Sequence, residues 1–140
     1  MMRVVLDTNV ILISIPSKSK FRPIFDGLLR GDYELAISND ILEEYIEVIE
    51  EKANAIVATN IAELLINLEN VAKVEVYFKW NLISADYDDN KFIDCAVAAN
   101  VRFVVSNDKH FNELQGVEFP KVEVIGVEEF LSEVKKLKGN

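Results

Sequence analysis

The sequence predicts an α/β fold in which helices flank a central parallel sheet, as a three-layer single domain spanning residues 1–140. Short apolar runs of about four residues alternate with longer segments whose apolar residues recur at helical spacing. The chain length fits one hydrophobic core, and half of the residues are hydrophobic, which favours a packed interior over disorder.

Each expected strand is a short apolar segment. The five segments are residues 3–6, 34–37, 74–78, 102–105 and 122–125. The first run ends at an acidic residue and has no polar alternation, which is typical of a strand buried on both faces of a parallel sheet.

The expected helices lie between these strands. Two of them begin near residue 9 and near Ser38. Four others cover residues 21–29, 60–71, 92–99 and 127–137. Gly31 is expected to end the first long helix, and Ser38 or Asn39 to cap the next one.

Cysteine and histidine are each present once. Cys95 alone excludes an internal disulfide and a cysteine-based zinc site, and we expect it to fill space in the core, as we do for Trp80 and the phenylalanines. His110 is expected on a surface loop. With so few soft ligands, a metal site would have to be built from oxygen atoms, which favours Mg²⁺ or Mn²⁺.

The apolar runs are too short for a membrane helix, which needs roughly 20 residues. Asp7 also comes too early for a secretory signal, so we expect a cytoplasmic protein with no membrane partner. The net charge of -9 argues against nucleic-acid binding unless local cations flank the site. The candidates for such a basic flank are Lys18, Lys20, Arg22, Lys91, Arg102 and Lys109.

Several acidic residues are expected at one edge of the sheet. Asp7 follows the first strand directly, and Asp108 follows the strand at 102–105. Asp88 and Asp89 stand before the helix at 92–99. If the strands are parallel, these carboxylates share the edge where ligands bind in open α/β sheets.

A helix acid can lean toward the same edge. Glu44 lies six residues after Ser38, and Glu43 lies on the neighbouring helix face. Taken singly, each acid has an ordinary structural explanation as a helix cap, a turn residue or a solvated side chain. The prediction of a site therefore depends on their combination.

Carboxylates held close together repel one another, which raises their pKa values unless a cation neutralises them. A bound Mg²⁺ or Mn²⁺ would relieve this repulsion and activate water for attack on a phosphodiester. This chemistry needs no protein nucleophile, in keeping with a chain that shows no serine-centred triad.

Four segments resemble the motifs of PIN domains in their order. They are residues 4–10, 38–45, 88–96 and 103–111, and residues 122–131 are similar to the closing strand and helix. The resemblance covers almost the whole chain and is closest to the VapC-like toxins of toxin–antitoxin pairs. It implies a metal-dependent endoribonuclease with an RNA substrate and an antitoxin partner.

The resemblance also implies roles for individual residues. The metal-binding and catalytic acids would be Asp7, Glu44, Asp89 and Asp108. Asn9 would orient Asp7, and the hydroxyl of Ser106 would hold Asp108 or a phosphate. Asp94 would be an additional acid, while Asp88 and Glu43 remain alternatives to their neighbours.

Other functions remain open from the sequence. A PIN-like scaffold without catalysis would bind a protein partner instead of RNA. A haloacid-dehalogenase-like phosphatase would need a second aspartate at position 9, where this chain has Asn9. A homodimer would use the apolar faces of the helices at 21–29 and 60–71, unless those faces pack on the core.

Overall fold

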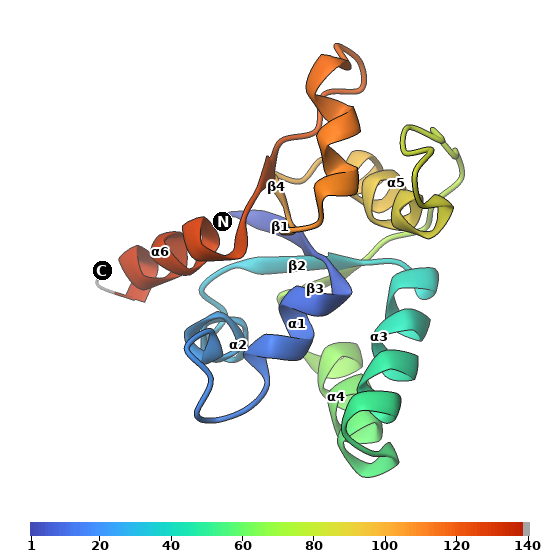
Figure 1. The fold of residues 1–140 in the computed structure, drawn as a ribbon. Helices are drawn as coiled ribbons and strands as arrows, with labels where there is room; N and C mark the ends of the chain where they lie inside the picture. The colour runs from blue at the N-terminus through green and yellow to red at the C-terminus, as the bar shows by residue number, and fades with distance from the viewer. Residues whose placement is uncertain (139–140) are drawn as a thin grey trace.

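A sheet of five parallel strands lies at the centre of the computed structural model, which describes residues 1–138 (Figure 1). The strand order is β3-β2-β1-β4-β5. The strands are β1 (Arg3–Leu6), β2 (Glu34–Ile37), β3 (Val71–Lys73), β4 (Phe103–Val105) and β5 (Val124–Ile125). The predicted α/β fold with a central parallel sheet is confirmed.

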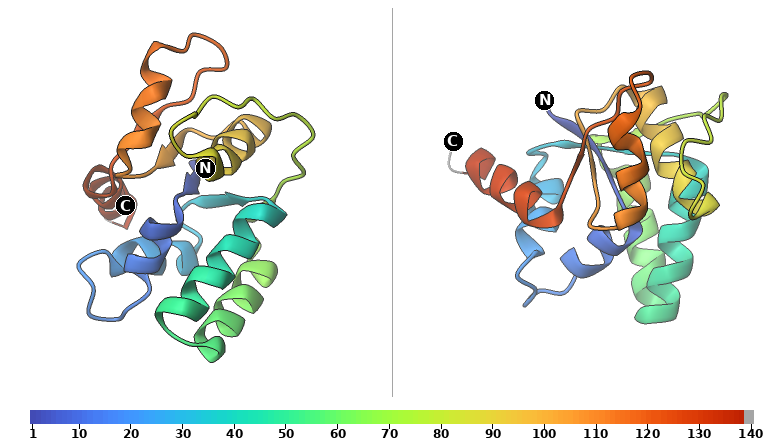
Figure 2. Two further views of the ribbon diagram at one scale, coloured as in Figure 1. Left: turned by 45° about the vertical axis from the view of Figure 1, so that its right-hand side comes forward. Right: turned by 45° about the horizontal axis from the view of Figure 1, so that its top comes forward.

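Helices cover both faces of this sheet (Figures 1 and 2). Helix α5 lies over one face, whereas α1 to α4 and α6 lie on the other. The helices are α1 (Thr8–Ser14), α2 (Arg22–Arg30), α3 (Asn39–Lys52), α4 (Ala55–Asn67), α5 (Asn90–Ala99) and α6 (Val127–Lys138). There are also two 3₁₀ segments: η1 (Tyr87–Asp89) precedes α5, and η2 (Lys109–Gly116) follows β4.

The helix boundaries at Gly31 and Ser38 are as predicted. Gly31 adopts φ 80°, a left-handed conformation that only glycine enters at little cost, and its N–H donates to the end of α2. The Ser38 hydroxyl accepts a hydrogen bond of 3.3 Å from the N–H of Ile41 and so caps α3. Gly31 thus ends α2 before β2, and Ser38 begins α3 directly after β2.

The predicted helix at 60–71 is wrong in its boundaries. Asn54 caps α4 by accepting from the N–H of Val57 at 2.9 Å, so the helix begins at Ala55 and ends at Asn67. Val71 belongs instead to β3, where it pairs with Leu35. The apolar spacing of the helix continues by chance into the strand, so that periodicity alone does not separate the two elements.

The strand predicted at 74–78 lies earlier in the chain, as β3. Its pairing with β2 ends with a hydrogen bond from the N–H of Val74 to the Ile37 carbonyl. Beyond it, Phe78 and Trp80 lie in an extended segment, and Phe119 packs edge-to-face on Trp80 with ring centroids 5.7 Å apart. Phe78 and Phe119 are 62% and 80% exposed. The expectation that all the phenylalanines are core residues is therefore wrong.

The core lies on both sides of the sheet and includes Cys95, which is fully buried as expected. Ile24 and Leu28 of α2 and Ile61 and Leu65 of α4 are buried too, so the apolar stripes of these helices face the core. Within residues 1–138, no helix has the length and apolar character needed to cross a membrane.

Candidate carboxylate site

The site lies where the strand order reverses. After β1 the chain adds β2 and β3 on one side, and it then returns through α5 to place β4 on the other side of β1. Asp7 follows β1 and Ser106 follows β4, and the N–H of Asp7 donates to the Val105 carbonyl at 3.0 Å. The parallel register therefore brings the two strand ends together, as expected for a ligand site in an open α/β sheet.

Asp7 is buried at this edge and is held by Ser106. The Ser106 hydroxyl donates to Oδ2 of Asp7 at 2.6 Å and accepts from the N–H of Asp108 at 2.9 Å. Burial raises the pKa of Asp7, the Ser106 hydrogen bond opposes this rise, and the charges of Asp108 and Glu44 add to it. Asp7 thus faces other acids in a poorly solvated position.

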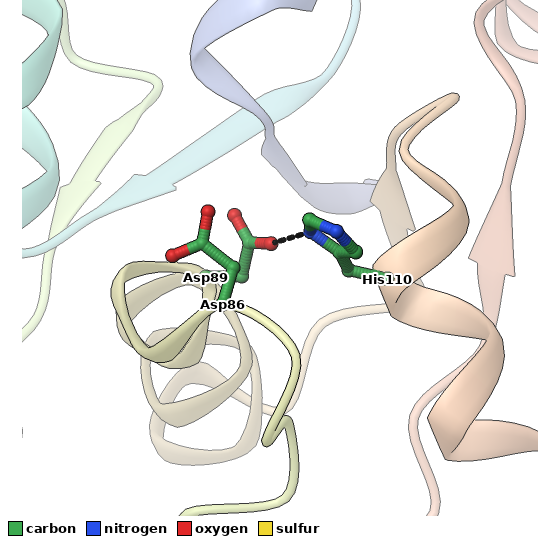
Figure 3. Close-up of side chains that lie close together, drawn as sticks. All are labelled: Asp86, Asp89 and His110. Atoms are coloured by element: carbon green, nitrogen blue, oxygen red, sulfur yellow. Dashed lines mark hydrogen bonds and ion pairs between the residues drawn. The ribbon is translucent and has the colours of Figure 1, made fainter.

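Asp89 comes from the turn before α5 and faces His110 (Figure 3). Its Oδ2 lies 3.0 Å from Nδ1 of His110, which also lies 3.2 Å from Oδ1 of Asp108. Burial, followed by the charges of Asp108, Asp86 and Asp7, raises the pKa of Asp89 to about 6 despite the His110 contact. The structure thus brings three of the four expected acids within electrostatic reach of one another.

The neighbouring acid Asp88 is exposed, in contrast to Asp89. Its backbone N–H donates to Oδ1 of Asp86 at 3.1 Å. The placement therefore favours Asp89 as the site residue.

Glu44 approaches from α3 and has both carboxylate oxygens occupied. Oε2 accepts a hydrogen bond from the Thr8 hydroxyl, and Oε1 forms an ion pair with Nζ of Lys91 at 2.9 Å. Glu43 is exposed on the next face of α3. The structure thus places Glu44, rather than Glu43, beside the strand edge that carries Asp7.

Two of the expected supporting residues lie apart from the carboxylates. The Asn9 side chain is exposed and, within residues 1–138, makes no hydrogen bond to Asp7, which Ser106 holds instead. Asp94 is buried and accepts from the N–H of Trp80 at 3.0 Å. Asp94 therefore anchors the segment before α5.

Sequence reasoning missed the contribution of three residues. His110 and Thr8 contact the acids directly, and the buried Tyr45 hydroxyl donates to the Leu6 carbonyl just before Asp7. His110 stands two residues after Asp108, and Thr8 directly follows Asp7. This closeness in sequence to an expected acid was the available signal, but a surface-loop explanation of His110 was equally compatible with it.

The expected basic flank is only partly present. Lys91 reaches Glu44, whereas Arg22 pairs with Asp26 at 2.9 Å and Lys20 pairs with Glu128 at 2.6 Å. Arg22 and Lys20 therefore neutralise acidic neighbours other than the carboxylates of the site.

The donor set fits a hard divalent cation. Asp7, Asp89 and Asp108 present anionic oxygens whose mutual repulsion contributes to the raised pKa values of Asp7 and Asp89. Lys91 and His110 balance only part of this charge. Because Mg²⁺ and Mn²⁺ prefer carboxylate oxygens, either ion would relieve the repulsion.

The comparisons with known proteins agree with this architecture. A family model described as PIN domain matches residues 3–110, so the chain belongs to the PIN domain family. No curated protein matches the sequence.

Two solved structures share the fold. VapBC2 from Rickettsia felis, bound to a DNA fragment from their promoter, has a TM-score of 0.63 and 16% identity, with 89% of this chain and 98% of that chain covered. DNA-bound VapBC from Salmonella typhimurium has a TM-score of 0.60 and 17% identity, with 91% and 99% covered. At these identities the likeness establishes the fold alone.

Proposed function

We propose that this PIN-domain protein is a metal-dependent endoribonuclease that cleaves RNA with a metal-activated water molecule. The observation that carries the proposal is the group of acids at the β1–β4 edge, where Asp7 and Asp89 have raised pKa values because of burial and neighbouring charge. Such a group is costly for folding and is typical of functional sites.

In this proposal Asp7, Asp89 and Asp108 hold Mg²⁺ or Mn²⁺. The bound ion would lower the pKa of a coordinated water molecule and would stabilise the charge that develops on the phosphate. Ser106 fixes the Asp7 carboxylate and the backbone of Asp108 through one hydroxyl. It thus sets the relative position of two of the three acids before any ligand arrives.

Glu44 completes the acidic site from α3. Thr8 and Lys91 donate to its two oxygens, which fixes the orientation of the carboxylate toward the strand edge. From this position Glu44 would orient the attacking water, and Lys91 would also lie near the RNA phosphate. Substrate phosphates thus meet a local cation, although the chain as a whole is acidic.

An antitoxin partner is part of the proposal. The two solved structures described above are both VapBC complexes. A hollow of about 500 Å³ adjoins Glu44 and is rich in acidic side chains, among them Asp40, Glu43 and Glu47. Its charge suits a basic segment of a protein partner, which would cover the site.

The test is cleavage of single-stranded RNA with Mg²⁺ or Mn²⁺, compared with DNA of the same sequence. Asp7→Asn is expected to abolish cleavage, and the exposed Asp88→Asn is the matched control. Cleavage that persists in EDTA, or in Asp7→Asn, contradicts the proposal. Metal binding without cleavage of any RNA supports the alternative of a scaffold that binds a protein partner.

A further inference from the structure

Beside the carboxylates already described, Asp86 and His110 form a second set of possible ligands around Asp89. One ligand atom from each of these three residues lies within 4.8 Å of the other two. Figure 3 shows the Asp89 carboxylate in contact with the His110 ring and the Asp86 carboxylate beside that of Asp89. The chain thus brings a nitrogen donor to a site that is otherwise made of oxygen.

We propose that His110 and Asp86 are additional ligands of the ion bound by Asp89, so that the site takes a divalent first-row transition metal in preference to Mg²⁺. This inference rests on the metal-dependent nuclease proposed above and specifies which ion it uses.

The spacing of the donors supports this ligation. Two atoms that lie about 2.1 Å from one ion in octahedral geometry are roughly 3.0 Å apart when adjacent and roughly 4.2 Å apart when opposite. Nδ1 of His110 lies 3.0 Å from Oδ2 of Asp89 and 3.2 Å from Oδ1 of Asp108. These atoms have the separation of neighbouring ligands, so one ion could contact all three of them.

The backbone already fixes the donors in this arrangement. The N–H of His110 donates to Oδ1 of Asp108 at 2.9 Å, which holds the histidine at the start of η2. Oδ1 of Asp86 accepts from the N–H of Asp88 at 3.1 Å at the start of η1. Both side chains therefore project from short turns that have local hydrogen-bonded support.

The chemistry of the donors indicates the class of metal. Carboxylate ligands bind both Mg²⁺ and Mn²⁺. An imidazole nitrogen increases the affinity for transition metals, but it contributes little to the affinity for Mg²⁺. A single nitrogen among carboxylates leaves Mn²⁺ well accommodated. The side chain of His110 is 31% exposed, so an ion can reach Nδ1 from solvent.

Because His110 is the only histidine, the untagged protein offers a direct test. The protein is loaded with Mn²⁺ and examined by pulsed EPR for coupling to an imidazole nitrogen. Such coupling is expected in the wild type and can come from no other side chain. Mn²⁺ that binds without nitrogen coupling overturns the inference while leaving the carboxylate site in place.

Calorimetric titration with Mn²⁺ and with Mg²⁺ gives a second measurement. His110→Phe is expected to weaken Mn²⁺ binding by about tenfold or more and to change Mg²⁺ binding much less. Asp86→Asn should weaken Mn²⁺ binding, whereas its exposed neighbour Asp88→Asn should not. If His110→Phe keeps the same preference for Mn²⁺ over Mg²⁺ as the wild type, the inference is overturned. If the wild type binds neither ion, the proposed nuclease is overturned as well.

Discussion

The hydroxyl of Ser106 lies 2.6 Å from Oδ2 of Asp7 and joins the carboxyl ends of β4 and β1. The two residues are far apart in sequence, and only the parallel pairing of their strands brings them into contact. The same hydroxyl accepts from the N–H of Asp108. Ser106 therefore connects two acids of the site.

Ser106→Ala is expected to lower the free energy of unfolding by about 1–2 kcal/mol, because it removes a hydrogen bond to a buried carboxylate. It should also reduce nuclease activity, since Asp7 loses its fixed orientation. Urea denaturation and RNA cleavage measure the two effects. Ser106→Thr retains the hydroxyl and serves as control, and equal losses in both variants would contradict the assigned contact.

Asp89 predicts a defined pH dependence of stability in metal-free protein. Its folded pKa of about 6 lies above the ordinary aspartate value of 3.8, so ionisation of Asp89 destabilises the folded state. This cost is absent below about pH 4 and complete above about pH 6. Asp89→Asn should therefore become more stable relative to wild type as the pH rises from 4 to 7.

Urea unfolding of both proteins in EDTA across this range measures the difference, in which the titrating groups other than Asp89 and its partner His110 largely cancel. The Asp89 contact raises the pKa of His110, and the loss of this contact in the variant changes the difference in the same direction. A stability difference that is independent of pH would contradict the raised pKa of Asp89. Asp88→Asn removes the same charge at the neighbouring exposed position and serves as the control.

Metal binding should stabilise the folded protein by an amount that rises with the logarithm of the ratio of free Mn²⁺ concentration to Kd. Mn²⁺ at 100 times its Kd is expected to add about 2.7 kcal/mol to the free energy of unfolding. Asp7→Asn combined with Asp89→Asn should remove this increase, which calorimetry and thermal unfolding can measure. Equal stabilisation of the double variant would mean that Mn²⁺ binds elsewhere.

Asp94 is expected to affect the segment before α5 more than the metal site. Asp94→Ala removes the acceptor for the N–H of Trp80 and should cost about 1 kcal/mol of stability. Asp94→Asn keeps an acceptor oxygen and should retain both stability and Mn²⁺ affinity. A large loss of Mn²⁺ affinity in Asp94→Asn would instead make Asp94 a ligand.

The strand ends of the site were predictable from the sequence. Asp7 and Asp108 follow short apolar runs, and parallel strands place such positions at one edge. The choice between Glu43 and Glu44, or between Asp88 and Asp89, depended on the resemblance to PIN domains. The structure distinguishes each pair by burial and contacts.

The contribution of His110 was not predictable. Its position depends on η2, which turns the chain back toward the start of α5 directly after Asp108. No apolar periodicity marks such a 3₁₀ turn. The boundary between α4 and β3 failed for a related reason, because a strand of three residues is too short to show an alternating pattern.

The burial of Cys95 has a practical consequence for experiments on this chain. Burial raises the pKa of its thiol to about 12, so almost no reactive thiolate is present at neutral pH. For maleimide chemistry, the folded protein behaves as though it had no cysteine. A single cysteine introduced at an exposed position such as Asn112 or Glu63 would therefore be the one residue that takes up a spin label or fluorophore. Such a label would report on motion near or far from the carboxylates. No native residue in the core would have to be replaced.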